Sequence, residues 1–287
     1  MKKVLTCIDG SLYGQICCQY ALWFAAKNGA AVDALYVSEI WQYEAPLVAD
    51  FGGSLGAQPY MGLTAQLRQI EADKAGVLRE YVLDSFEKAG LAGQVAFHHR
   101  TGTLADCVGE FETGGERPEL LIVGKRGEGA NMAKAHLGAN MERVVRASPL
   151  PCFVANREFF EPRTLLFACD GSASANKAVA WYLSNRKAFE NAKTHIVGVA
   201  AKPGDVAKAG EVVQAVEKMF ADSACAPSAV KVLQGVPADV IAAYQQEHEA
   251  NMLLMGAYGH SRIRRLLIGS TTVELLQRCR IPVILFR

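Results

Sequence analysis

The feature of this sequence that most constrains its fold is an internal repeat. Short apolar runs alternate with longer segments of helical character, and the same order occurs in both halves of the 287-residue chain. Strands that alternate with helices form parallel sheets, because each helix carries the chain back across the sheet before the next strand begins. The sequence therefore predicts an α/β fold of two tandem doubly wound domains, each a five-stranded parallel sheet with helices on both faces.

The repeat can be followed strand by strand. The strands predicted in the first half are Val4–Ile8, Ala31–Val37, Gln94–Arg100, Leu120–Val123 and Cys152–Ala155. Those predicted in the second half are Thr164–Ala168, His195–Ala200, Ala229–Gln234, Asn251–Met255 and Pro282–Phe286. In the first half we expect helices from about Leu12 to Asn28, from about Thr64 to Ala89, after Thr103 and near Asn140–Ala147.

The halves join at Asn156–Pro162, a polar and aromatic segment that ends in proline. Such a segment is typical of a domain boundary, which predicts domains at 1–156 and 163–287. One glycine-rich insertion, at about 41–66, has no counterpart beyond Lys202-Pro203-Gly204 in the second half. An insertion of this length is usually functional or mobile. A surface loop over its own domain, a lid over a ligand and a partner contact all remain open.

Glycines gather after the fourth predicted strand of the second half. The chain there reads Gly256-Ala257-Tyr258-Gly259, nine further residues, and then Gly269-Ser270-Thr271. Glycine lets the backbone approach a ligand closely, and the second group opens a helix whose first N–H groups have no intrahelical partner. Those donors and the positive end of the helix dipole favour an anion. The segment predicts a phosphate-binding loop at the carboxyl edge of the sheet.

This loop resembles the nucleotide loop of the universal stress protein family, whose pattern is Gly, two residues, Gly, nine residues, Gly, and then Ser or Thr. Further landmarks of the family match Asp9-Gly10-Ser11 and Asp170-Gly171-Ser172, each of which follows the first strand of its half. The resemblance covers nearly the whole chain. It implies a tandem member of the family that binds ATP in its second domain.

The resemblance also implies which residues bind the nucleotide. In chain order they are Ala168, Asp170, Val199, Gly256, Gly259, Gly269, Ser270 and Thr271. Ala168 and the backbone of Val199 would border adenine, and Asp170 would accept hydrogen bonds from ribose or adenine. The glycines and the two hydroxyl residues would hold the phosphates, and Mg²⁺ can arrive with ATP. The same loop holds basic residues for which phosphate contact and salt bridges both stay open, namely His260, Arg262, Arg264 and Arg265.

The corresponding loop of the first half departs from the pattern. It reads Gly124-Lys125-Arg126-Gly127, ten residues, and then Gly138-Ala139-Asn140. Ala139 lacks the hydroxyl, a loss of about 1.5–3 kcal/mol in phosphate binding. We expect weak or absent nucleotide binding there, although Lys125 and Arg126 can attract an anion and Asn140 can cap the next helix or donate a substitute bond. For Asp9, a binding role and a turn-stabilising role both stay open.

The sequence offers no convincing catalytic or metal-binding constellation, and we assign no catalytic residue and no metal ligand. His248-Glu249-Ala250-Asn251 is not a zinc-protease motif, and the neighbouring His98 and His99 point to opposite faces of a strand. The 8 cysteines include no Cys-x-x-Cys pair, and we expect buried thiols at Cys7, Cys152 and Cys169.

Three functions stay open at this point. The first, implied by the resemblance, is a nucleotide-dependent regulatory or stress-response protein. The second is slow ATP hydrolysis, since water and Mg²⁺ can enter such a site. The third is a nucleotide-independent scaffold that recruits a protein partner through the first domain and its insertion.

Net charge and hydropathy limit the kinds of binding partner and the cellular location that we expect. Thirty Lys+Arg against 29 Asp+Glu leave a net charge of +1, which indicates neither nucleic-acid binding nor a polybasic membrane patch. No apolar run approaches the roughly 18 residues of a membrane span, and Met1-Lys2-Lys3 leads straight into a strand rather than a signal peptide. We therefore expect a cytoplasmic protein. By resemblance, the two last strands of the halves pair across an edge, and a homodimer of the whole chain is a further expectation.

Overall fold

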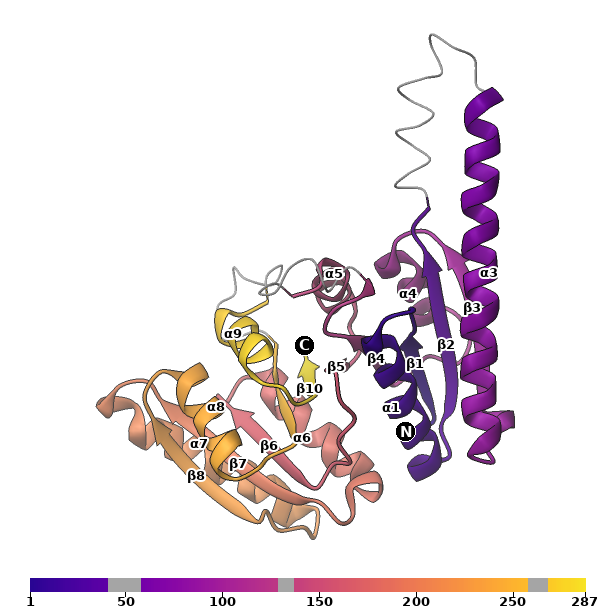
Figure 1. Cartoon of the computed structure of the whole chain (residues 1–287). Coiled ribbons are helices and arrows are strands. Elements are labelled where there is room, and N and C mark those ends of the chain that lie inside the picture. Colours follow the sequence, from indigo (N-terminus) through magenta and orange to yellow (C-terminus); the bar gives the residue numbers. More distant parts are fainter. Residues whose placement is uncertain (41–57, 129–136, 258–267) are drawn as a thin grey trace.

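Ten strands form one continuous sheet in the computed structural model (Figure 1). The structure describes residues 1–40, 58–128, 137–257 and 268–287, with side chains in the long helix from Leu63 onward. The strand order is β3-β2-β1-β4-β5-β10-β9-β6-β7-β8, so each half contributes five neighbouring strands in equivalent order.

The first half follows the predicted alternation of strands and helices. Its strands are β1 (Lys3–Cys7), β2 (Ala31–Ser38), β3 (Val95–Thr101), β4 (Leu120–Gly124) and β5 (Cys152–Ala155). Its helices are α1 (Leu12–Asn28), α3 (Gln58–Lys88), α4 (Leu104–Thr113) and α5 (Ala139–Ala147), with a short 3₁₀ turn at Ala92–Gln94.

The second half repeats this order. Its strands are β6 (Thr164–Cys169), β7 (Lys193–Ala200), β8 (Ala229–Gln234), β9 (Met252–Gly256) and β10 (Val283–Phe286). Its helices are α6 (Ala173–Asn185), α7 (Val206–Asp222), α8 (Pro237–Glu247) and α9 (Ser270–Arg278), with 3₁₀ turns at Arg186–Phe189 and Pro203–Asp205.

The halves meet along their last strands, as expected. Strands β5 and β10 pair antiparallel, with Ile284 opposite Phe153, whereas the pairs within each half are parallel. Pairing closes two edge strands that would otherwise expose unpaired backbone groups. The predicted fold class is confirmed, with the addition that the two parallel sheets merge into one mixed sheet.

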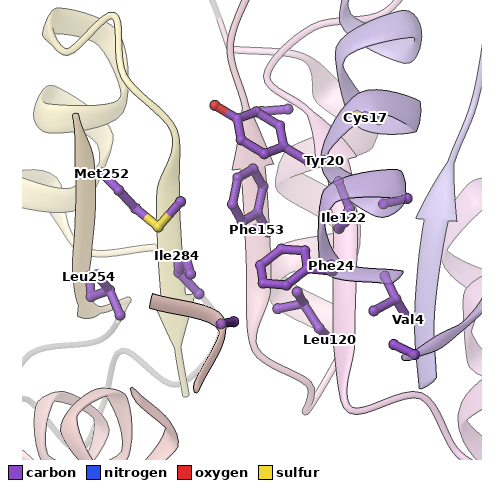
Figure 2. Packing of buried hydrophobic residues seen from close by; sticks show 14 of the residues in the cluster. Val4, Cys17, Tyr20, Phe24, Leu120, Ile122, Phe153, Met252, Leu254 and Ile284 are labelled. Atoms are coloured by element: carbon purple, nitrogen blue, oxygen red, sulfur yellow. The ribbon is translucent and has the colours of Figure 1, made fainter. Parts of the chain in front are cut away.

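Buried side chains from both halves share one core on each face of this sheet. On one face, Tyr20 and Phe24 of α1 pack on Phe153 of β5, with ring centroids 4.5 and 5.9 Å away (Figure 2). The ring of Trp23 in α1 also contacts that of Phe189 in the second half, with centroids 5.4 Å apart. Because aromatic contacts cross the joint between the halves, where β5 pairs with β10, the halves pack as one body.

One helix of the first half starts earlier than the sequence predicted. Helix α3 begins at Gln58 and not at Thr64, so the end of the glycine-rich insertion is helical. Its Pro59 lies in the first turn, where a missing N–H costs no hydrogen bond, and so does not end the helix. The remainder of the insertion, residues 41–57, lies outside the described residues. Figure 1 shows α3 extending well beyond the strands that it covers.

The predicted buried thiols are confirmed, since Cys7, Cys152 and Cys169 are all buried. Among the helices in the described part of the chain, none is long and apolar enough to cross a membrane.

Candidate functional site

The carboxyl ends of three neighbouring strands bring the predicted second-half residues together. Ala168 of β6 lies opposite Val197 of β7 and Met255 of β9. Val199 follows two residues later on β7, and Gly256 ends β9. Ala168 and Val199 are half-buried, so they form an apolar wall that remains accessible.

Asp170 stands in a tight turn directly after β6. Its Oδ1 accepts a hydrogen bond from the Ser172 N–H at 2.9 Å, and the Ser172 hydroxyl caps α6 by accepting from the Ala175 N–H at 3.2 Å. Gly171 between them has φ of +76°, a left-handed conformation that favours glycine. The turn therefore fixes the Asp170 carboxylate, which is exposed, at the edge of the apolar wall.

The two described glycines of the predicted loop serve different purposes. A Cβ on Gly256 would lie 2.4 Å from Ser174 Oγ and 3.2 Å from the Ala175 nitrogen, so the approach of α6 alone requires glycine there. Among the described residues, a Cβ on Gly269 would meet nothing closer than the Ala257 carbonyl oxygen at 3.5 Å. Close packing therefore explains Gly256, whereas the described neighbours of Gly269 do not crowd it.

Helix α9 begins beside this strand end, and among the described residues no side chain caps its first turn. Gly269 is its N-cap and makes no side-chain cap hydrogen bond, and its own N–H donates to the Ala257 carbonyl at 3.1 Å. The first N–H groups of the helix, at exposed Ser270 and half-buried Thr271, have no intrahelical acceptor. Hydroxyls and backbone donors thus occupy the positive end of the helix dipole.

Thr272 anchors this helix, a role that the sequence analysis missed. Its side chain is buried, and Oγ1 donates toward the carbonyl oxygens of Gly256 and Ala257 at 3.4 Å each. The hydroxyl therefore ties the first turn of α9 to the end of β9. The signal in the sequence was the third hydroxyl residue in the run Ser270-Thr271-Thr272.

The remaining predicted loop residues lie outside the described residues. They are Gly259, His260, Arg262, Arg264 and Arg265. The structure thus brings together seven of the eight predicted site residues at the ends of β6, β7 and β9 and the start of α9.

The first half carries a cleft of about 590 Å³ at the equivalent edge. Its apolar wall includes Cys7 and Val37, which correspond to Ala168 and Val199 in the second half. Asp9, at the position of Asp170, also lines the cleft, as do the glycines of the degenerate loop and the start of α5. Helix α3 adds a wall through Leu67, Glu71 and Lys74.

Two side chains hold the polar turn of this cleft. Asp9 Oδ1 accepts from the Ser11 N–H at 3.1 Å and from its hydroxyl at 2.5 Å, and the Gly10 N–H donates to Glu128 Oε1 at 2.8 Å. Lys74 pairs with the other oxygen of Glu128 at 2.5 Å. Burial raises the pKa of the Asp9 carboxyl, and the nearby Glu128 charge also raises it. Asp9 therefore does stabilise its turn.

Comparison with known proteins agrees with this repeated architecture. Residues 1–156 and 162–287 each match the universal stress protein family. "Universal stress protein Slr1230" of Synechocystis sp. (strain ATCC 27184 / PCC 6803 / Kazusa) is 37% identical over 301 residues, which cover 100% of both chains. The chain belongs to the universal stress protein family.

Solved structures give the family's fold. A universal stress protein from Archaeoglobus fulgidus DSM 4304 matches with a TM-score of 0.71 and 18% identity, and the match covers 99% of this chain and 98% of that one. An Arabidopsis thaliana family protein with AMP bound matches 44% of this chain and 91% of its own, at 18% identity and a TM-score of 0.34. The first match shows the tandem fold alone, and the second is too partial to place a ligand in this chain.

Within this family fold, Lys125 does not serve as the expected anion-attracting residue. Its buried ammonium donates to the Cys279 carbonyl at 3.2 Å, at the C-terminal end of α9 in the other half. Asn156 donates to the same carbonyl at 3.2 Å. Burial lowers the pKa of Lys125 to about 8. The expectation was wrong because the side chain crosses the joint between the halves, a contact that is invisible in the sequence.

Asn140 does not cap the helix that follows it, which was one of its two expected roles. Helix α5 begins at Gly138 as N-cap, with no side-chain cap hydrogen bond, and the Asn140 amide instead donates to Glu39 Oε1 at 3.1 Å.

Both histidines of β3 form hydrogen bonds with side chains of the neighbouring strand β2. His98 Nε2 pairs with Asp33 Oδ1 at 3.0 Å, and His99 Nε2 pairs with Ser38 Oγ at 2.5 Å. The described residues contain no group of three or more acidic, histidine or cysteine side chains that could hold a metal ion.

Proposed function

We propose that this universal stress protein is a nucleotide-dependent regulatory protein of the stress response, and that it binds ATP in its second half. The observation that carries the proposal is the start of α9. A helix N-terminus that no described side chain caps, and that carries two hydroxyl residues, is anchored by Thr272 at the strand edge that also presents the exposed Asp170 carboxylate. This arrangement supplies donors for phosphate and an acceptor for ribose within one site.

Each part of the nucleotide has a proposed partner. Adenine would lie against Ala168 and the backbone of Val199, and Asp170 would accept from ribose or adenine hydroxyl and amino groups. Phosphates would take the N–H groups near Gly256, Gly259, Gly269 and Ser270, and the hydroxyls of Ser270 and Thr271. Hydrogen bonds to charged groups contribute about 1.5–3 kcal/mol each, so four or five suffice for the roughly 8 kcal/mol of micromolar binding.

The same proposal covers Mg²⁺, location and assembly. The ion would bind with the triphosphate and not at a dedicated protein site. We further propose domains at 1–156 and 163–287, a cytoplasmic location, and a homodimer of the whole chain. Slow ATP hydrolysis and a nucleotide-independent scaffold remain the competing functions. Release of ADP under turnover would indicate the first, and a protein partner bound equally well without ATP would indicate the second.

Calorimetric titration of the nucleotide-stripped chain with ATP and Mg²⁺ tests the proposal. We expect about one site per chain. Val199→Trp fills the proposed adenine slot and should weaken ATP binding by at least about 100-fold. Val37→Trp, the equivalent change in the first half, is the matched control and should leave ATP binding intact. Equal ATP affinity in wild type and Val199→Trp would show that ATP does not bind at the proposed second-half site.

A further inference from the structure

The first-half cleft keeps the parts of the site that would hold a nucleoside. Cys7 and Val37 form the apolar wall, and further apolar side chains deepen it, namely Ile8, Ile40, Leu104, Val123 and Leu137. Asp9 stands at the position of the proposed ribose acceptor. The volume of about 590 Å³ lies in the ordinary range of small-molecule pockets.

Two carboxylates of the protein itself lie at the polar edge of this cleft. At the start of α5, the Asn140 side-chain amide donates to Glu39 Oε1 at 3.1 Å, so this carboxylate lies beside the first turn of the helix. At the Asp9 turn, Glu128 Oε1 accepts the Gly10 N–H at 2.8 Å. The start of α5 and the Asp9 turn thus each have a carboxylate beside them, supplied within the same chain.

The described lining of the cleft carries more negative than positive side chains, which disfavours an added phosphate. That lining carries four carboxylates, from Asp9, Glu39, Glu71 and Glu128, against the two cations of Lys74 and Arg126. Lys74 is engaged by Glu128 at 2.5 Å. Glu71 accepts a hydrogen bond from the Tyr36 hydroxyl. In a partly enclosed cleft, like charges repel more strongly than they do in bulk water.

We propose that the first-half cleft binds an unphosphorylated nucleoside and rejects its phosphorylated forms, because the Glu39 and Glu128 carboxylates that line it repel a phosphate. The apolar wall would receive the base, and Asp9 would accept from the ribose hydroxyls. The choice of a nucleoside rests on the proposed function, because the equivalence of the two halves supplies the base slot. The chain would then bind two different ligands, a nucleotide in its second half and the dephosphorylated nucleoside in its first half.

Adenosine and ATP with Mg²⁺, titrated into the full chain carrying Val199→Trp, test this assignment. This background removes the proposed second-half site. We expect one adenosine per chain and ATP at least about tenfold weaker, a difference of about 1.4 kcal/mol. Adding Val37→Trp should abolish adenosine binding. A folded Val199→Trp chain that binds no adenosine, or that binds ATP as tightly as adenosine, would overturn the proposal.

A charge variant tests the role of the carboxylates without filling the cleft. In the Val199→Trp background, Glu39→Gln should raise ATP affinity about tenfold and change adenosine affinity by less than about twofold. Glu87→Gln makes the same charge change at an exposed position near the end of α3 and should change neither affinity. ATP affinity that is unchanged by Glu39→Gln would contradict the proposal. Failure of wild type to bind ATP would instead contradict only the second-half site, since the adenosine titration does not depend on it.

Discussion

The two halves place the same strands, turn and glycine-flanked helix at the same edge of the sheet, but they anchor that helix differently. In the second half, Thr272 ties α9 to its own strand β9. In the first half the equivalent residue is Met141, which is buried in the core, and the loop before α5 sends Lys125 across to the end of α9. Two halves with the same backbone fold can therefore differ in chemistry, because side chains at a few positions decide how the helix at the site is held in place.

The halves also differ in the carboxylates that lie near these helix starts and turns. The first half presents Glu39 and Glu128 to its helix start and its turn, through Asn140 and Gly10. In the second half, the described start of α9 carries Ser270 and Thr271, whose hydroxyls can donate to an incoming anion. The described residues of the two edges thus differ in chemistry, and the substitutions below probe the differences between the halves.

The largest effect is expected from Gly256→Ala. The new Cβ would lie 2.4 Å from Ser174 Oγ, so α6 must move away from β9. Overpacking of this kind should lower the free energy of unfolding by about 3 kcal/mol, measured by denaturant titration. Gly269→Ala is the control within the same loop, because no described atom lies closer than 3.5 Å to its Cβ, and it should cost less than about 1 kcal/mol. Equal losses would mean that packing does not distinguish the two glycines.

A pH-dependent effect is expected at Lys125. Its folded pKa of about 8 lies below its unfolded value near 10.4, so the unfolded chain binds more protons between these two pH values. The stability of the folded chain therefore rises with pH in this window. Relative to Lys125→Met, wild type should gain about 2 kcal/mol in unfolding free energy between pH 7 and pH 9.5.

The comparison with Lys125→Met cancels the titration of other groups. Denaturant unfolding of both proteins at the two pH values measures it. A constant difference between wild type and variant would show that this lysine does not titrate in the joint between the halves.

A moderate effect is expected on nucleotide affinity when the hydroxyl of Ser270 is removed. Ser270→Ala should weaken ATP binding about tenfold, because one hydrogen bond to phosphate is lost, without changing the unfolding free energy. The converse change, Ala139→Ser, should leave ATP binding to the first half weak, since Glu39 still occupies the start of α5. Calorimetry that finds strong ATP binding after Ala139→Ser alone would mean that the missing hydroxyl, and not the carboxylates, separates the halves.

The smallest effect is expected from Thr272→Val. The variant keeps the shape of the side chain and loses the donor to Gly256 and Ala257, both at 3.4 Å. We expect a loss of about 1 kcal/mol in unfolding free energy and weaker ATP binding, because the first turn of α9 is then less firmly placed. Met141→Leu in the first half changes core packing alone and should leave ATP affinity unaltered. Unchanged ATP affinity in Thr272→Val would show that the anchor does not serve the site.

Much of the fold could be predicted because hydrophobic periodicity and turn residues act over short distances. The strands Cys152–Ala155 and Ala229–Gln234 were predicted with the bounds that the structure has. Helix α3 was the main boundary error, since Pro59 and Gly62 suggested a loop where a first helical turn accommodates proline. The family assignment also came from local residues, namely the spaced glycines and the two Asp-Gly-Ser turns.

The candidate site was predicted less completely, for a physical reason. The sequence named the residues of the turn and the helix start, which are close along the chain. It did not show Thr272 as an anchor or Glu39 and Glu128 as neighbours of the first-half donors. Glu128 reaches Gly10 across 118 residues of sequence, and Asn140 reaches Glu39 across 101. Such contacts depend on how the elements pack.

By itself, the sequence determined the alternation of strands and helices, the doubling of the domain and the chemical character of the second-half loop, because backbone propensity and residue spacing encode these locally. The tertiary structure alone decided that β5 and β10 merge the halves into one sheet, that Lys125 is buried at the end of α9, and that carboxylates stand at the first-half donors. Those features arise from side chains that meet only after the sheet has formed. The carboxylates that line the first-half cleft are therefore a property of packing, not of the motif.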